Sequence, residues 1–223
     1  MVASISHRNL VLSFTAVCAL LAPVTGRAAG GSPTASDSAP IVLAAPKDFS
    51  SAVRVLEQVT GAKGEKLRVG DVPLEQGRSF AVAPRVAQRL LDGSHDAFKR
   101  AGLFLFRYER SFGVADEKDH VGLLRTADGS AVIRSVGTAG VRGAPSSDAI
   151  VAWLEALAKE EPFELSEIGT DYVAGRFARA PKDPMAVAKR CAEFAPELVA
   201  GRASTLELLA HEIAADRTLY LIW

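Results

Sequence analysis

The sequence has few of the features on which charge-driven and cysteine-based functions depend. It contains only two cysteines, Cys18 and Cys191, and Cys18 lies in an apolar N-terminal stretch. If that stretch is removed, no intramolecular disulfide can form, and a metal site built on several cysteines is excluded. Basic and acidic residues both number 26, so the formal net charge is zero. No basic stripe is present that could neutralise a run of phosphates, which argues against nucleic acid as a partner.

Motifs of common hydrolases and nucleotide-binding proteins are also missing. The sequence has no Gly-x-Ser-x-Gly elbow, no His-Glu-x-x-His, no phosphate-binding glycine loop and no dinucleotide fingerprint. Residues 137–143 are rich in glycine, but their spacing does not fit a phosphate-binding loop, and Pro145 and Ser146 intervene before the next helix. We therefore expect a mobile loop there, and we predict no cofactor and no metal site.

The N-terminal residues differ from the rest of the chain. Arg8 precedes an uncharged apolar stretch over residues 10–21, Pro23 follows it, and small residues surround Ala28. A charged, apolar and small-residue order is typical of a secretory signal peptide. The apolar stretch is shorter than the about 20 residues that span a membrane, although an uncleaved anchor is the alternative. We expect a signal peptide over residues 1–28 and an exported protein, periplasmic or secreted, with no membrane span after cleavage.

The composition of the remaining chain is that of one folded domain behind a short tether. Residues 29–40 are mainly small and turn-forming, which indicates a flexible tether. Hydrophobic residues make up 48% of the sequence, which places it among ordinary globular chains. We therefore predict a single α+β domain over residues 41–223.

Hydrophobic periodicity predicts that helices and strands alternate along this domain. The Asp128-Gly129 pair favours a hairpin turn between two strands, Ser50 and Asp183 are suited to cap helices, and the 204–207 segment has capping-box spacing. The expected helices cover residues 51–60, 84–91, 147–159 and 184–195, with a short helical turn over 96–101 and a last helix opened by 204–207. The expected strands cover residues 66–69, 79–82, 103–106, 121–124, 131–133, 163–168, 172–177 and 219–223.

The order of the expected elements suggests a particular fold. From Ala131 onward the order is strand, helix, strand, strand, helices and strand, which is that of a ferredoxin-like α/β sandwich. Extra helices and strands would precede it. We therefore predict a mixed or antiparallel sheet with helices on one face.

Several segments of the chain resemble a bacterial family known only as domain of unknown function 4253. The similarity extends over residues 80–223 and is strongest after Ile150; it is carried by residues 80–84, 101–106, Trp153, 169–173, 181–184, 193–199 and 220–223. The chain differs from the family pattern where residues 195–197 are Ala-Pro-Glu instead of Cys-Pro-Asp, where residues 138–143 replace an Asn-rich loop, and where it ends at Ile222-Trp223 rather than two tryptophans and an aspartate. The resemblance implies a fold and a possible interaction role, and it supplies no catalytic residues.

Asp171, Tyr172 and Trp223 are the candidates for a binding site. Asp171 lies between two expected strands, next to Tyr172, where an aspartate could anchor a partner or ligand. The alternative is a turn aspartate that bonds its own backbone. Trp223 follows an apolar strand and is expected to pack on the core, but if exposed it would be an aromatic anchor for a partner. We therefore predict a non-catalytic module with a possible protein partner.

A hydrolase is the alternative function, with His120 as its central residue. His120 closes an acidic run just before an expected strand, so Asp116, Asp119 or Asp171 could reach its ring. A solvated loop is the competing interpretation, because one histidine beside acids lacks the spacing of a known site.

The remaining histidines and the second cysteine have simple structural interpretations. Cys191 shares a helix face with Val187 and Phe194, which predicts a buried and inert thiol. His95 lies in an expected turn between two capping residues, and His211 follows Glu207 by one helical turn on an expected solvated face.

Overall fold

Seven strands form one mixed sheet in the computed structural model, which describes residues 39–70, 72–111, 117–200 and 205–223. The order across the sheet is β1-β2-β4-β3-β5-β6-β7, and every neighbouring pair is antiparallel except β3 and β5, which are parallel. The strands are β1 (Glu65–Val69), β2 (Val72–Val82), β3 (Phe104–Glu109), β4 (Asp119–Leu124), β5 (Phe163–Ile168), β6 (Tyr172–Phe177) and β7 (Thr218–Ile222).

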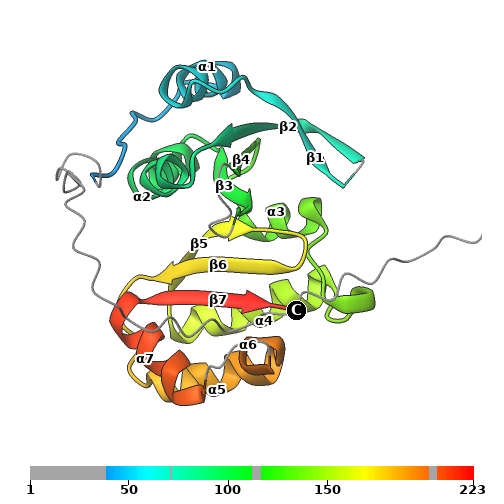
Figure 1. The fold of residues 1–223 in the computed structure, drawn as a ribbon, viewed down its shortest axis with the longest axis vertical. Coiled ribbons are helices and arrows are strands. Elements are labelled where there is room, and N and C mark those ends of the chain that lie inside the picture. The colour runs from blue at the N-terminus through cyan, green and yellow to red at the C-terminus, as the bar shows by residue number, and fades with distance from the viewer. Residues whose placement is uncertain (1–38, 71, 112–116, 201–204) are drawn as a thin grey trace, which may run out of the picture. The chain divides into compact units, whose positions relative to one another are not determined.

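The described helices occur in two groups along the chain (Figure 1). The first group is α1 (Phe49–Thr60) and α2 (Pro84–Arg100), which alternate with β1 to β3. The second group is α3 (Gly129–Val136), the 3-10 helix η2 (Val141–Gly143), α4 (Ser147–Glu160), α5 (Pro184–Phe194), α6 (Glu197–Ala200) and α7 (Leu206–Asp216). None of the helices within the described residues is long and apolar enough to cross a membrane.

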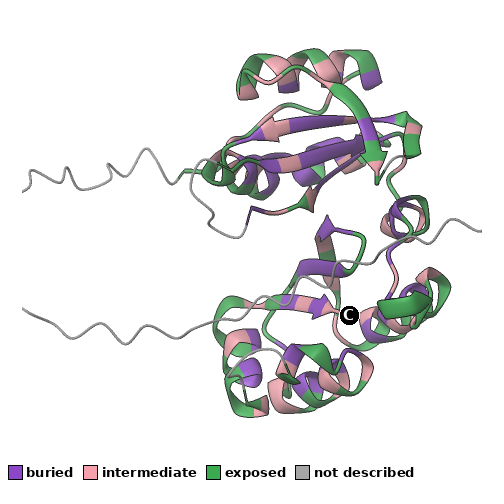
Figure 2. Cartoon of the chain, turned by 45° about the vertical axis from the view of Figure 1, so that its right-hand side comes forward, coloured by how far each residue is buried: buried purple, intermediate pink, exposed green. Residues whose placement is uncertain are grey.

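The two groups of helices cover opposite faces of the sheet. Along β3, Leu105 packs in a core with α1 and α2, whereas Phe104 and Phe106 pack in a second core with the later helices. Because successive side chains of a strand point to opposite faces, this alternation assigns one core to each face. The buried residues follow the strands and the inner sides of the helices in Figure 2. The expectation of helices on one face alone is therefore wrong, because β3 is apolar on both sides.

The segment that precedes α1 is hydrogen-bonded to α2. The Ile41 amide donates to the Arg89 carbonyl at 2.8 Å, and Ser94 Oγ donates to the Ile41 carbonyl at 2.6 Å. A Cβ at Gly93 would lie 2.2 Å from that same Ile41 carbonyl oxygen. Gly93 is therefore required by the close approach of this segment, and it does not interrupt the helix.

The hairpin expected at Asp128-Gly129 is a helix instead. Asp128 Oδ1 accepts a hydrogen bond from the Ser130 amide at 2.9 Å, which is the contact of an N-cap, and α3 begins at the next residue. Val132, Ile133 and Val136 then bury one helical face. Because residues 131–133 are helical, the expected element order fails at its first strand. The structure supports the mixed α/β class and does not confirm the ferredoxin-like arrangement.

Several boundaries also differ from those expected. The helix predicted to stop at residue 91 continues to Arg100, and β2 begins at Val72 rather than at residue 79. Asp48, not Ser50, caps α1, in a reciprocal pair with Ser51. Thr205 Oγ1 caps α7 by accepting from the Leu208 amide at 3.3 Å, whereas the expected 204–207 box begins outside the described residues.

Contacts along the chain divide it into residues 1–34 and residues 35–223, and all the described residues belong to the second unit. The expected signal peptide lies outside the described residues, as does nearly all of the expected tether.

Candidate functional site

A cluster of buried charges lies at the carboxyl ends of β3 and β5. Arg107 Nε lies 3.1 Å from Asp119 Oδ2 of β4, and Arg107 Nη1 lies 3.2 Å from Glu167 Oε1 of β5. The three side chains are only 4%, 1% and 6% exposed. Buried charges need such pairing, because removal from water costs each of them several kcal/mol.

Further contacts complete this cluster. The Ser111 amide and hydroxyl both donate to Asp119 Oδ1, at 2.9 and 3.0 Å. Arg107 Nη2 donates to Gln88 Oε1 of α2 at 3.2 Å, and Arg110 Nη2 donates to Glu167 Oε1. Two arginines therefore balance two carboxylates, and the cluster links α2 to three strands without net charge.

Bulges in both strands direct these side chains. The register of β3 with β4 shifts between Arg107 and Glu109, and the register of β5 with β6 shifts between Leu165 and Glu167. An extra residue at a bulge bends the strand and changes the direction of nearby side chains, which is why bulges are frequent beside functional sites. Here the two bulges flank Arg107 and Glu167, the paired residues of the two parallel strands.

The chain leaves the ends of β3 and β5 in opposite directions. From β3 it turns back into β4 on one side, and from β5 it turns back into β6 on the other side. In open sheets, divergence of the connections at the carboxyl ends of parallel strands leaves a crevice, and ligands commonly bind there. The topology therefore identifies this edge of the sheet as a candidate site before any side chain is considered.

A hollow of about 550 Å³ is present at this edge, and we call it the Arg110 hollow. This volume is within the usual range of ligand sites. Its lining is rich in polar groups that recognise charge, with exposed Arg68, Glu109 and Asp171 at the surface and Arg110 and Tyr172 deeper. It is lined by Arg68, Val69, Gly70, Tyr108, Glu109, Arg110, Val136, Thr170, Asp171, Tyr172 and Ile222.

The Tyr172 hydroxyl and Arg110 Nε are buried groups in this hollow that lack a hydrogen-bond partner among the described residues. Tyr172 is 5% exposed, and its buried hydroxyl has no hydrogen-bond partner among the described residues. Burial raises the pKa of Tyr172 well above its ordinary value, and the charge of Glu167 adds to the rise. The group is therefore a protonated donor at neutral pH, and a buried donor without an acceptor costs about 1–3 kcal/mol.

The turn from β5 to β6 is fixed by hydrogen bonds to all three of its carbonyls. Thr138 Oγ1 donates to the Gly169 carbonyl at 2.7 Å, and the Ala139 amide donates to the Thr170 carbonyl at 2.9 Å. The Trp223 amide donates to the Asp171 carbonyl at 3.0 Å. Residues 138 and 139, expected in a mobile loop, thus support this wall of the Arg110 hollow.

The structure brings Asp171 and Tyr172 together in the hollow but leaves Trp223 apart from it. Trp223 is 7% exposed and packs edge-on against Phe194 at 5.8 Å, and its Nε1 donates to the Phe194 carbonyl at 3.3 Å. The exposure that an aromatic anchor requires is therefore lacking. Trp223 contributes through its backbone, which holds Asp171 in place.

Of the carboxylates proposed for His120, Asp119 is the one whose described contacts lie elsewhere. Asp119 is adjacent to His120 in β4, so their side chains point to opposite faces, and Asp119 is already engaged with Arg107 and Ser111. The acid nearest to His120 in the described part of the chain is Glu109, with 3.9 Å between Oε2 and Nε2. Asp116 lies outside the described residues, and the hydrolase stays a prediction.

Cys191 is 1% exposed, as the helix pattern predicts. Burial raises the pKa of its thiol to about 12, which leaves it protonated and unreactive at neutral pH.

Sequence reasoning missed Arg68, Arg107, Arg110 and Glu167. Arg107 follows the apolar run 103–106 directly, and a charge at the end of a buried strand is a usable signal. The pairing of Arg107 with Glu167 spans 60 positions, and no local pattern indicates it.

The class of this protein is thus a mixed α/β domain with a fixed polar crevice at the ends of its two parallel strands. Comparison with known families adds that residues 120–223 match a family model described as Domain of unknown function (DUF4253). The resemblance noted in the sequence is confirmed over this segment. The segment contains Glu167, Asp171 and Tyr172, and it excludes Arg107 and Arg110.

No curated protein and no solved structure matches the chain.

Proposed function

We propose that the domain is a non-catalytic binding module that takes a carboxylate group of a protein partner into the Arg110 hollow. The observation that carries this proposal is the buried Tyr172 hydroxyl, a donor without an acceptor, in the same hollow as a guanidinium group. A carboxylate accepts several hydrogen bonds at once and pairs well with arginine. It would accept hydrogen bonds from the Tyr172 hydroxyl and from Arg110 Nε, which also lacks a partner among the described residues.

The shape and charge of the hollow support a protein partner. Glu109 and Asp171 are exposed beside Arg68, so the rim has both signs of charge. A partner surface with an acidic side chain flanked by a basic one complements that rim, and electrostatic complementarity of this kind provides specificity. The fixed turn also reduces the entropy lost on binding.

We further propose that the protein acts after export, in the periplasm or outside the cell. The support is the signal-peptide order of residues 1–28 and the small-residue tether over 29–40. A partner should accordingly be sought among envelope or secreted proteins.

Peptide binding monitored by NMR tests the proposed site. The protein would be titrated with pools of acidic peptides from the envelope proteins of its host, each peptide prepared with free and with amidated carboxyl groups. We expect the free acids alone to shift the amide signals of residues 169–172. Tyr172→Phe should weaken binding at least about tenfold, because a hydrogen bond to a charged group contributes about 1.5–3 kcal/mol.

Arg110→Gln should weaken binding further, and Arg179→Gln, an exposed arginine outside the hollow, is the matched control. Circular dichroism verifies that each variant is folded. The proposal would be refuted if binding were unchanged in both Tyr172→Phe and Arg110→Gln. It would also be refuted if the peptides bound equally well after amidation.

A further inference from the structure

A second polar cluster, distinct from the Arg110 hollow, lies around His95 of α2. Its Nδ1 lies 2.7 Å from the Leu105 carbonyl oxygen of β3. A carbonyl oxygen only accepts hydrogen bonds, so Nδ1 must carry the proton. With the proton on Nδ1, a lone pair for a ligand can be only on Nε2.

The second ring nitrogen, Nε2, differs from Nδ1 in its hydrogen bonding. His95 is 6% exposed, and its buried Nε2 has no hydrogen-bond partner among the described residues. An unsatisfied buried group costs about 1–3 kcal/mol, and a ligand bound to Nε2 would remove that cost. The lone pair of Nε2 is therefore available to a ligand.

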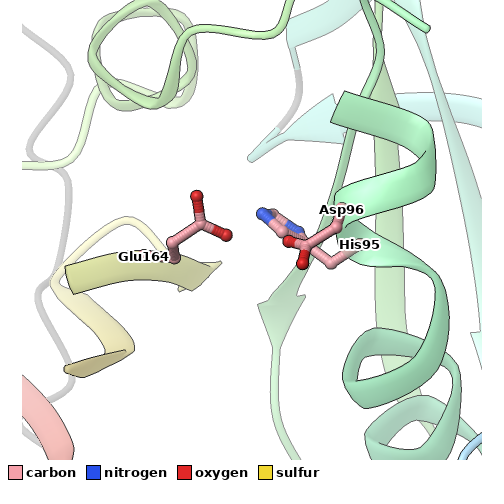
Figure 3. Close-up of side chains that lie close together, drawn as sticks. All are labelled: His95, Asp96 and Glu164. Atoms are coloured by element: carbon pink, nitrogen blue, oxygen red, sulfur yellow. The ribbon is translucent and has the colours of Figure 1, made fainter. Parts of the chain in front are cut away.

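Two carboxylates lie beside the His95 ring. Asp96 follows His95 in α2 and Glu164 lies near the start of β5, and one ligand atom from each of the three residues lies within 4.8 Å of the others. Figure 3 shows the imidazole edge and both carboxylates turned toward one another. One buried imidazole and two accessible carboxylates thus surround a common point.

We propose that His95, Asp96 and Glu164 bind a divalent transition-metal ion, and that Zn²⁺ is the ion they fit best. Imidazole nitrogen and carboxylate oxygen are ordinary zinc ligands. Three protein ligands leave a fourth position for water or for a side chain of a partner.

The surroundings of the cluster fit this assignment. Metal-binding histidines usually donate their other ring N–H to a backbone carbonyl or carboxylate, which fixes the tautomer and the ring orientation. The Leu105 carbonyl provides that contact. Lys99 Nζ pairs with Glu164 Oε1 at 2.6 Å, which holds the Glu164 carboxylate beside the cluster.

The site would join two parts of the fold. His95 and Asp96 belong to a helix of the first group, and Glu164 belongs to a strand beside the second group. A bound ion would add a link between α2 and β5 at the end of β5 opposite to the Arg110 hollow.

Equilibrium binding of Zn²⁺ to the full chain, measured by isothermal titration calorimetry, tests the proposal. We expect one ion per chain with micromolar or tighter affinity. Asp96→Asn and Glu164→Gln change exposed residues and should fold normally, so they avoid the risk of a substitution at buried His95. Each should weaken binding more than about 100-fold, since loss of even an outer contact costs 10–100-fold.

Asp92→Asn, one turn earlier on α2, and His211→Gln, an exposed histidine, are the matched controls. Both should bind Zn²⁺ like the unaltered protein. No binding by the unaltered chain at 100 µM Zn²⁺ (about a hundred times a micromolar Kd) overturns the proposal, as does binding that persists in Asp96→Asn and Glu164→Gln.

Lys99→Gln should have the opposite effect on the affinity for Zn²⁺. Lys99 competes with the ion for the charge of Glu164, so its removal should tighten binding up to about fivefold, the range of an exposed ion pair. Unchanged or weaker binding in this variant would contradict the assignment of Glu164 as a ligand.

Discussion

The two polar clusters of this domain differ in how their charges are balanced. Around Arg107, two arginines and two carboxylates compensate one another, and Ser111 and Gln88 supply further contacts. Around His95, a buried nitrogen has no protein partner and the two neighbouring carboxylates are exposed. The comparison separates a buried cluster whose charges cancel, which we expect to stabilise the fold, from a buried nitrogen beside accessible carboxylates, which we expect to bind a ligand.

The largest effect should come from breaking the compensated cluster. Arg107→Ala leaves Asp119 and Glu167 buried beside each other, and loss of one partner of a buried ion pair typically costs about 3–5 kcal/mol. Urea denaturation measures this change. Glu75→Gln, which removes the exposed pair between Lys66 and Glu75, is the control and should cost less than about 1 kcal/mol. Equal small losses in the two variants would show that the Arg107 cluster is not structural.

The cluster around His95 should be stabilised by a bound ion. Zn²⁺ at a hundred times its dissociation constant should raise the free energy of unfolding by about 2.7 kcal/mol, because the ion binds the folded chain. Thermal denaturation with and without a chelator measures the effect. Asp96→Asn should abolish it while Arg107→Lys retains it; stabilisation that remains in Asp96→Asn would argue for another site.

Tyr108 and Tyr172 differ in whether the hydroxyl group has a hydrogen-bond partner. The Tyr108 hydroxyl lies 2.8 Å from Ser79 Oγ, whereas the Tyr172 hydroxyl has no partner among the described residues. Tyr108→Phe should therefore lower the free energy of unfolding by about 1 kcal/mol, and Tyr172→Phe should leave it unchanged or raise it by a similar amount. Chemical denaturation of both variants compares them directly. A marked loss of stability in Tyr172→Phe would mean that its hydroxyl is bonded in the folded protein.

The smallest effect on stability should come from the buried thiol of Cys191. The pKa of the Cys191 thiol is raised by burial from 9.0 to about 12. Between these values the unfolded chain releases the proton and the folded chain keeps it, so the folded state binds more protons and stability falls as pH rises. From pH 8 to pH 9 the loss should be only about 0.3 kcal/mol. Cys191→Ala should flatten this part of the stability–pH curve; a slope identical to that of the unaltered protein would refute the assignment.

Local sequence patterns were sufficient to predict several helices and strands in the second half of the fold. The strands expected over 163–168 and 172–177 have those bounds in the structure, and the helix expected over 147–159 is one residue longer. Each has a clear apolar pattern with turn or capping residues at its ends. The error at Asp128-Gly129 arose because an aspartate before glycine suits both a tight turn and a helix N-cap.

The candidate sites were mostly beyond the reach of sequence reasoning. Asp171 and Tyr172 could be identified because they lie at a turn inside a family-like segment. His95 was placed in a turn because Ser94 and Asp96 on either side of it suit helix caps, whereas α2 continues through all three residues. Glu164 lies 65 positions from Lys99 and the pairing of Arg107 depends on a bulge, so both clusters arise from long-range geometry.

The bulge at Tyr108 makes the length of β3 more critical than the identity of its residues. Deletion of Tyr108 would restore a regular ladder with β4, in which Glu109 still faces His120, but it would also remove the bend that the extra residue gives to the end of β3 and so change the direction of Arg110. A single codon lost at this position would therefore remove the guanidinium of Arg110 from the hollow without altering any residue that lines the far wall. Insertions and deletions in β3 should accordingly be far less tolerated than substitutions of Tyr108.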